Sequence, residues 1–89
     1  MTIFKSTLTI TDPIGLHARP ASEIVKAVKL TGLSVKLGRD AKSMVSVNSP
    51  LQLMALKVKT GEVLQVSVEA EDEVAALKLI DNLQDLLRG

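Results

Sequence analysis

The stretch "DPIGLHARPASEIV", Asp12 to Val25, decides the fold, because the chain changes there from a strand to a helix. Its first four residues, Asp-Pro-Ile-Gly, are typical of a turn. Apolar residues then recur at intervals of three and four, which predicts an amphipathic helix over residues 18–30 with a buried face of Ala21, Ile24, Val25 and Val28. Gly32 follows this helix and can adopt the positive φ that ends one.

Segments on both sides of this helix alternate between apolar and polar residues, as half-buried strands do. Residues 2–10 predict the first strand. Residues 33–37 and 43–47 repeat the alternation on either side of the turn "GRDAK", which predicts a hairpin of two strands. Residues 62–69, "EVLQVSVE", predict a fourth strand.

Two further helices are indicated by their start signals. Ser49 and Pro50 are typical of the N-cap and the first residue of a helix, and they predict a short helix from Pro50 to about Lys57. An acidic run from Glu69 to Glu73 suits the start of the last helix. The predicted buried stripe of that helix is Ala76, Leu77, Ile80, Leu83 and Leu87. The order βαββαβα predicts a single two-layer α+β domain over residues 1–89, with its helices on one face of the sheet.

The composition excludes several classes of function. There is no cysteine, so disulfides and thiolate metal sites are absent, and this usage fits the cytoplasm. The net charge is +1 and Phe4 is the only aromatic residue, which argues against nucleic-acid binding. No apolar run is long enough for a signal peptide or a membrane span. We expect a soluble intracellular protein, monomeric, without membrane insertion and without a metal or cofactor.

The only histidine, His17, is the candidate reactive residue. It can also be an incidental solvated or capping residue in a small binding module. A metal site needs several ligands, and there is no second histidine. A Ser-His-Asp relay needs a serine against the ring, and nothing in the sequence places one there. The remaining chemistry is that of a nucleophile that accepts a phosphoryl group.

The neighbours of His17 agree with phosphoryl transfer. A helix start supplies unpaired N–H groups and a positive dipole end. The guanidinium of Arg19 can pair with phosphate oxygens. Pro20 costs little at a helix start, and Gly15 allows a sharp turn and an uncrowded approach.

The segment "GLHARPA", Gly15 to Ala21, resembles the active-site segment of HPr, the histidine-containing phosphocarriers of the bacterial sugar phosphotransferase system. "NSPLQLMALKV", residues 48–58, is similar to the second-helix motif of that family, so the resemblance covers the whole chain. It implies an open-faced sandwich with a four-stranded antiparallel sheet, in which the fourth strand lies between the first and the second. It also implies a carrier that is not itself an enzyme.

The resemblance further implies the roles of individual residues. His17 would be phosphorylated through Nδ1, and Arg19 would bind the phosphate together with Gly15 and Ala18. Enzyme I would be the donor and the sugar-specific IIA domains would be the acceptors. The implied partner-binding residues are Leu16, Pro50, Leu51 and Met54, while Leu53 and Leu56 would lie in the core.

Ser49 matches the serine that HPr kinase/phosphorylase modifies in some branches of this family. Ser-Pro is also simply a good helix start, so both interpretations stay open. A regulatory homologue acting through Ser49 is therefore the alternative to a phosphocarrier. The chain departs from the common family pattern at Ile14, where many members have a small polar residue, and at Lys57, where a small residue is common.

Overall fold

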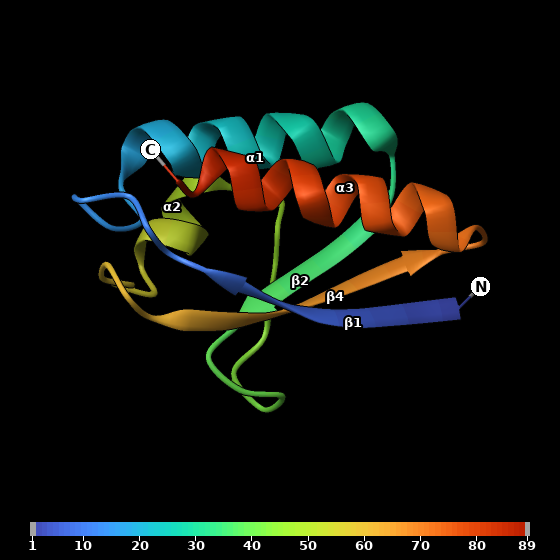
Figure 1. Cartoon of the computed structure of the whole chain (residues 1–89), viewed down its shortest axis with the longest axis horizontal. Helices are drawn as coiled ribbons and strands as arrows, with labels where there is room; N and C mark the ends of the chain where they lie inside the picture. The colour runs from blue at the N-terminus through green and yellow to red at the C-terminus, as the bar shows by residue number, and fades with distance from the viewer. Residues whose placement is uncertain (1, 89) are drawn as a thin grey trace.

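The computed structural model describes residues 2–88, which form four strands and three helices in the order βαββαβα (Figure 1). The elements are β1 (Thr2–Thr9), α1 (Ala18–Thr31), β2 (Ser34–Gly38), β3 (Val45–Ser46), α2 (Pro50–Met54), β4 (Val63–Ala70) and α3 (Glu73–Leu86). The predicted order of elements is confirmed. No helix among these residues is both long and apolar enough to cross a membrane.

The four strands form one antiparallel sheet in the order β1-β4-β2-β3. β4 lies between β1 and β2, as the family resemblance implied. Its pairing with β1 runs from Thr2 opposite Ala70 to Thr9 opposite Val63. The last strand of the chain therefore joins the first strand to the second, and the sheet is complete only when distant segments meet.

The helices cover one face of this sheet, as predicted (Figure 1). Alternation along β4 creates the two faces, because successive side chains of a strand point in opposite directions. Leu64, Val66 and Val68 are buried, while Val63, Gln65 and Glu69, which alternate with them, are exposed. α1 and α3 contact each other above the buried face, so the core is a single aliphatic layer between sheet and helices.

The helix α1 matches its sequence pattern closely. Ala21, Ile24, Val25 and Val28 are all buried, as the spacing predicted. The helix ends at Gly32, which has φ 70° and donates its N–H to the Val28 carbonyl oxygen. Glycine suits this position because it adopts the left-handed conformation without a Cβ penalty.

The helix α3 is rotated slightly from the predicted orientation. Asp72 is its N-cap and accepts a hydrogen bond from the Val74 N–H. With this start, Leu79 joins the buried stripe at 3% exposure, while Leu77 is 49% exposed. The assignment of Leu77 to the core was therefore wrong. The other predicted stripe residues, Ala76, Ile80, Leu83 and Leu87, are buried.

Two predicted elements are shorter in the structure. β3 consists only of Val45 and Ser46, rather than residues 43–47. α2 ends at Met54, rather than near Lys57, and Lys57 has a left-handed backbone with φ 53°. The N–H groups of Leu56 and Lys57 donate to the carbonyl oxygens of Leu53 and Met54, three residues back, so the chain tightens into turns after Met54. The left-handed backbone of Lys57 then prevents any further helix.

Arg39 determines where the segment after α2 goes. Its guanidinium donates to the carbonyl oxygens of Leu56 and Lys57, at 2.6 and 3.1 Å. It also donates to both carboxylate oxygens of Glu62, at 3.0 and 3.2 Å. One side chain from the turn after β2 thus anchors the segment that follows α2. The periodicity of a segment cannot predict a contact with a residue as distant in sequence as Arg39.

Candidate functional site

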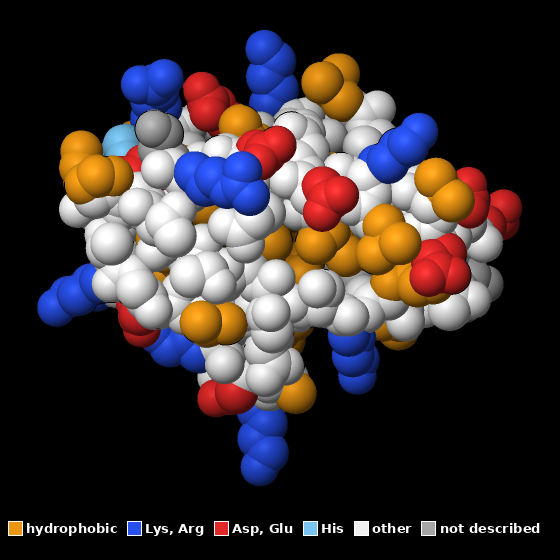
Figure 2. All heavy atoms as spheres, in the orientation of Figure 1, with side chains coloured by type: hydrophobic (Ala, Val, Ile, Leu, Met, Phe, Trp, Pro, Cys, Tyr) orange, Lys and Arg blue, Asp and Glu red, His pale blue; other side chains and the backbone are white. Residues whose placement is uncertain are grey.

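His17 occupies the N-cap position of α1, where the loop after β1 becomes helix. Its backbone is extended, with φ −108° and ψ −171°, and its side chain is 30% exposed. In Figure 2 the single histidine is visible at the surface, at the end of the molecule where α1 begins. The first N–H groups of a helix have no intrahelical acceptor, so those of Ala18 and Arg19, the two residues after His17, have no such partner.

The loop before His17 is held tightly against the segment after α2. Gly15 has φ 86°, and a Cβ at this position would lie 2.8 Å from the Val58 carbonyl oxygen. The next N–H, that of Leu16, donates to the same oxygen at 3.1 Å. Gly15 is thus required both by its backbone conformation and by the close approach of Val58.

Two sequence assignments change because of this packing. The N–H of Gly15 donates to the Asp12 carbonyl oxygen, so this group closes a turn and is not available for phosphate. Leu16 is only 6% exposed and packs in the core, so it does not present a partner surface. Ile14, which was noted only as a departure from the family pattern, is instead 74% exposed beside the site.

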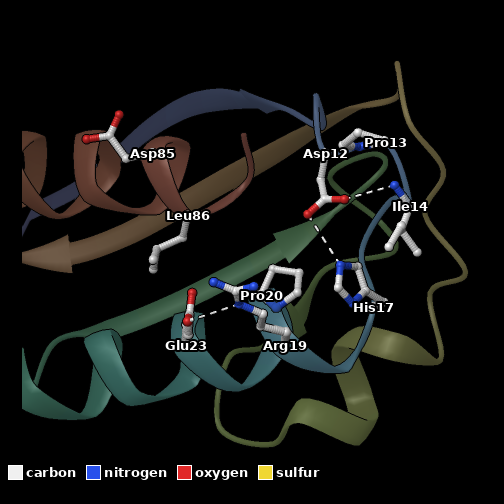
Figure 3. Close-up of a pocket in the computed structure, with 9 residues that line it drawn as sticks. All are labelled: Asp12, Pro13, Ile14, His17, Arg19, Pro20, Glu23, Asp85 and Leu86. Atoms are coloured by element: carbon white, nitrogen blue, oxygen red, sulfur yellow. Dashed lines mark hydrogen bonds and ion pairs between the residues drawn. The ribbon is translucent and has the colours of Figure 1, made fainter. Parts of the chain in front are cut away.

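Asp12 is the residue of this site that the sequence did not reveal. One of its oxygens, Oδ2, lies 3.3 Å from Nε2 of His17, and Oδ1 accepts a hydrogen bond from the Ile14 N–H at 2.8 Å (Figure 3). Asp-Pro reads as turn chemistry, and the carboxylate does close a turn. The spacing of five residues between Asp12 and His17 does not indicate a contact, because only the folded loop brings the ring back to this carboxylate.

The surroundings keep Asp12 ionised at neutral pH. The hydrogen bond from the Ile14 N–H is the main cause that lowers its pKa, and burial opposes this effect. The bond to His17 and the charges of His17 and Arg19 lower the pKa further. An ionised carboxylate only accepts hydrogen bonds, so the proton shared with His17 belongs to Nε2.

Arg19 does not contact the imidazole in this structure. Its side chain is 83% exposed, and Nε lies 3.8 Å from Oε1 of Glu23, one turn further along α1 (Figure 3). Both residues line a shallow pocket with His17 and Asp12, closed on the other side by Asp85 and Leu86 of α3. The guanidinium is therefore near the site but held by an exposed ion pair.

The remaining sequence-predicted residues lie on α2, which packs against the start of α1. Leu51 is 74% exposed, Pro50 and Met54 are half-buried, and Leu53 is fully buried. Met54 and Leu56 both pack partly against the core. Leu51 is therefore outward and Leu53 inward as predicted. Met54 and Leu56 do not divide in that way, because both are half-buried.

Ser49 occupies the N-cap position of α2, as predicted, and is half-buried. Its side chain makes no capping hydrogen bond. Over residues 2–88, no cluster of three or more His, Cys, Asp or Glu side chains is arranged to hold a metal ion.

A family model described as the PTS HPr component phosphorylation site matches residues 4–86. The chain is 38% identical to the phosphocarrier protein HPr of Treponema pallidum over 77 residues, which cover 86% of each protein. It is 38% identical to the phosphocarrier protein HPr of Haloferax volcanii over 82 residues, which cover 91% of this chain and 89% of that protein.

Solved structures show the same arrangement. HPr-C-His from Thermoanaerobacter tengcongensis superposes with a TM-score of 0.78 at 29% identity, over 97% of this chain and 96% of that one. The phosphocarrier protein HPr from Bacillus anthracis superposes with a TM-score of 0.80 at 21% identity, over 97% of this chain and 98% of that one. At 21% identity the second likeness supports the fold alone.

Proposed function

The chain belongs to the HPr family of phosphocarrier proteins of the phosphotransferase system, and we propose that His17 carries its phosphoryl group on Nδ1. As a member of this family the protein is a phosphoryl carrier and not a catalyst of its own reaction. It needs one protein that donates the phosphoryl group and another that removes it.

The observation that carries this assignment is the contact between Asp12 and His17. Because the carboxylate accepts from Nε2, the lone pair of the neutral ring is on Nδ1. A nucleophilic nitrogen needs that lone pair, and a ring that is 30% exposed can offer it to a partner protein. Unpaired N–H groups at the start of α1, from Ala18 and Arg19, can then donate to the phosphate oxygens.

Arg19 is the proposed cationic partner of the phosphate. Its side chain lines the same pocket as His17, and its present partner Glu23 is 46% exposed in a pair 3.8 Å apart. Exposed pairs of this kind are weak, because water and salt compete with them. A phosphoryl group on His17 carries more charge than one carboxylate, so the guanidinium turns from Glu23 towards it.

Enzyme I is the proposed donor and the IIA domains are the proposed acceptors, and we place the protein with them in the cytoplasm. Family membership supports these partners in general. Ile14 is exposed and lines the pocket with His17. Leu51 is exposed on α2, which contacts α1 and also carries Pro50 and Met54. Apolar side chains around a reactive group suit brief protein contacts of small area.

Intact-mass measurement after incubation with Enzyme I and phosphoenolpyruvate tests the proposal. The parent protein gains one phosphoryl group, in a linkage that is labile in acid and stable in alkali. His17→Ala removes this gain while the circular dichroism spectrum stays that of a folded α+β protein. A His17→Ala protein that still acquires an acid-labile phosphoryl group would contradict the assignment.

Ser49 is a second candidate site, for regulation rather than transfer. Its hydroxyl makes no capping bond, although it occupies a position where serine usually makes one. Among residues 2–88, phosphorylation of this hydroxyl would therefore break no capping bond. Incubation with HPr kinase/phosphorylase and ATP tests this use of the residue, with Ser49→Ala as control; no alkali-labile phosphate on the parent means that Ser49 is only a helix start.

A further inference from the structure

We propose that Asp12 is a positioning residue that selects the reactive nitrogen of His17 and balances the charge of the phosphorylated ring. This inference rests on the proposed function of His17 as the phosphoryl acceptor. It assigns to the carboxylate a part in the chemistry, in addition to its part in the turn before α1.

The position of Asp12 is set independently of the histidine. Its N–H donates to the Leu87 carbonyl oxygen at 2.9 Å, and its own carbonyl oxygen accepts from the Gly15 N–H and from the Thr60 hydroxyl. Asp12 is also the one buried residue with a charged side chain among those that the structure describes, at 6% exposure. A carboxylate buried in this way is costly unless its oxygens accept hydrogen bonds.

The two oxygens of this carboxylate have separate tasks. Oδ1 accepts from the Ile14 N–H at 2.8 Å, which fixes the plane of the carboxylate. Oδ2 faces Nε2 of His17 at 3.3 Å. Figure 3 shows the two oxygens of the carboxylate joined by dashed lines to these two groups. Since the carboxylate cannot donate, the ring in contact with it is the Nε2–H tautomer, and Nδ1 keeps the lone pair.

The transfer step creates the charge that Asp12 balances. The lone pair of Nδ1 forms a bond to phosphorus, while the bond between phosphorus and the donor atom breaks and its electron pair stays on the donor. Nε2 keeps its proton throughout, so the phosphorylated ring acquires a positive charge. The carboxylate at 3.3 Å is the nearest counter-charge. When the phosphoryl group leaves, the electron pair returns to Nδ1 and the ring is neutral again.

The other charged groups around the pocket cannot replace Asp12. Arg19 and Glu23 from α1 pair with each other, and Asp85 from α3 pairs with Arg88 at 2.8 Å. None of the three has an ion pair or hydrogen bond to the imidazole among the contacts of residues 2–88. The tautomer of His17 therefore depends on Asp12 alone among these groups.

Two substitutions of Asp12 separate this role from a purely structural one. Asp12→Asn keeps an oxygen for the Ile14 N–H but turns an NH2 donor towards Nε2, which favours the Nδ1–H tautomer and blocks the nucleophile. Asp12→Ala removes both contacts, so the turn is weakened but both tautomers are allowed. If Asp12 sets the tautomer, the Asp12→Asn protein is phosphorylated more slowly than the Asp12→Ala protein. If Asp12 only supports the turn, the order is the reverse.

The experiment measures the rate of phosphorylation by Enzyme I and the tautomer of His17, the latter from nitrogen-15 spectra of the ring. We expect the Nε2–H tautomer in the parent, mainly Nδ1–H in Asp12→Asn, and a loss of rate of about tenfold or more in Asp12→Asn, as for other groups that orient a histidine. Asp85→Asn, which removes a pocket carboxylate that does not bond the ring, is the control and leaves the tautomer unchanged.

Three results would overturn the inference: a parent ring protonated on Nδ1, an Asp12→Asn protein as fast as the parent, or an Ala variant slower than the Asn variant. The spectra of the parent need no variant to fold and no phosphorylation. A failure of the proposed function is distinct from these results, because it appears as phosphorylation of the His17→Ala protein.

The phosphorylated proteins give a second readout. Without the carboxylate, the phosphorylated ring loses its Nε2 proton at lower pH, and a neutral ring is a poorer leaving group. As the pH is raised, the hydrolysis rate of the phosphorylated Asp12→Asn protein therefore starts to fall at a lower pH than that of the phosphorylated parent. Superimposable pH profiles would show that Asp12 does not balance the charge of the ring.

Discussion

Gly15 is the residue where two backbone constraints meet, a positive φ of 86° and the Val58 carbonyl oxygen 2.8 Å from the place of a Cβ. Gly61 has a similar φ of 91° but nothing within 4 Å of its Cβ position. The two glycines therefore form a matched pair that differs in steric contact and not in backbone conformation.

We predict that Gly15→Ala destabilises the protein more than Gly61→Ala. Left-handed backbone costs an alanine about 1–2 kcal/mol, and this cost applies at both positions. At Gly15 the contact with Val58 adds to it and displaces the loop that carries His17. Urea unfolding of both variants, with phosphorylation assays, measures the difference. Equal losses of unfolding free energy and equal phosphorylation rates would mean that the loop accommodates the Cβ without strain.

Arg19 and Glu23 form the other residue-scale prediction. Arg19→Ala slows phosphoryl transfer by about tenfold, less than a buried charge-assisted bond would contribute, because water and salt compete at this exposed site. Glu23→Gln releases the guanidinium and leaves the transfer rate equal to or above that of the parent. Transfer kinetics at low and high salt check both, and a slower Glu23→Gln protein would show that the pair itself orients Arg19.

At the scale of single residues, the sequence indicated His17, the proposed acceptor, but not the carboxylate that contacts it. His17 was singled out by its uniqueness and by the helix start that follows it. Asp12 could not be found in the same way, because a carboxylate before proline already has a sufficient explanation as turn chemistry. Its contact with the ring depends on the path of the loop, which Val58, Thr60 and Leu87 set from other parts of the chain.

Among the elements, α2 has the sharpest division between its two faces. Leu51 is 74% exposed, and Leu53, two residues later, is fully buried. The helix is only five residues long, so a single side chain makes up a large part of its exposed surface.

We predict opposite results for a charge on the two faces. Leu51→Glu leaves the melting temperature almost unchanged but weakens the binding of Enzyme I by about 1–3 kcal/mol, the scale of desolvating an unpaired polar group. Leu53→Glu unfolds the domain, because it places a charge in the core. Thermal melts and titration with Enzyme I distinguish the two; a Leu51→Glu protein that binds like the parent would remove α2 from the interface.

The elements that sequence periodicity predicted well are those whose bounds depend on their own residues. α1 begins and ends where its stripe and Gly32 indicate, and β4 alternates along its full length. α2 does not, because the chain tightens after Met54, where the N–H groups of Leu56 and Lys57 bond to carbonyl oxygens three residues back. Which side chains of α3 face the core depends on where its cap, Asp72, starts the helix. The sequence pattern could not decide this, because the helix contains several leucines.

For the whole molecule, two carboxylates link folding to pH. The Ile14 N–H is the main cause that lowers the pKa of Asp12, and the Arg39 guanidinium is the main cause that lowers the pKa of Glu62. Between its folded and unfolded pKa values, each group binds more protons in the unfolded chain. The free energy of unfolding therefore rises with pH in that window.

We predict that this stabilisation is complete above about pH 5 and is lost as the pH falls below about 4, the range of ordinary carboxylates. Urea unfolding at a series of pH values measures the loss. Asp12→Asn combined with Glu62→Gln lowers the stability at neutral pH and flattens its decline in acid. Asp81→Asn, on the exposed face of α3, is the control, and a double variant with the same slope as that control would contradict the linkage.

The hydrogen bonds from the N–H groups of Thr11 and Asp12 to the Leu87 carbonyl oxygen also have a consequence for the kinetics of folding. They join the loop before His17 to a residue on the far side of the sequence, beyond α1, the sheet strands β2 to β4 and α3. Contacts between such distant segments carry a large loop-closure entropy and form late in folding. The loop that carries His17 is therefore expected to reach its final path after the local helix α1 has formed.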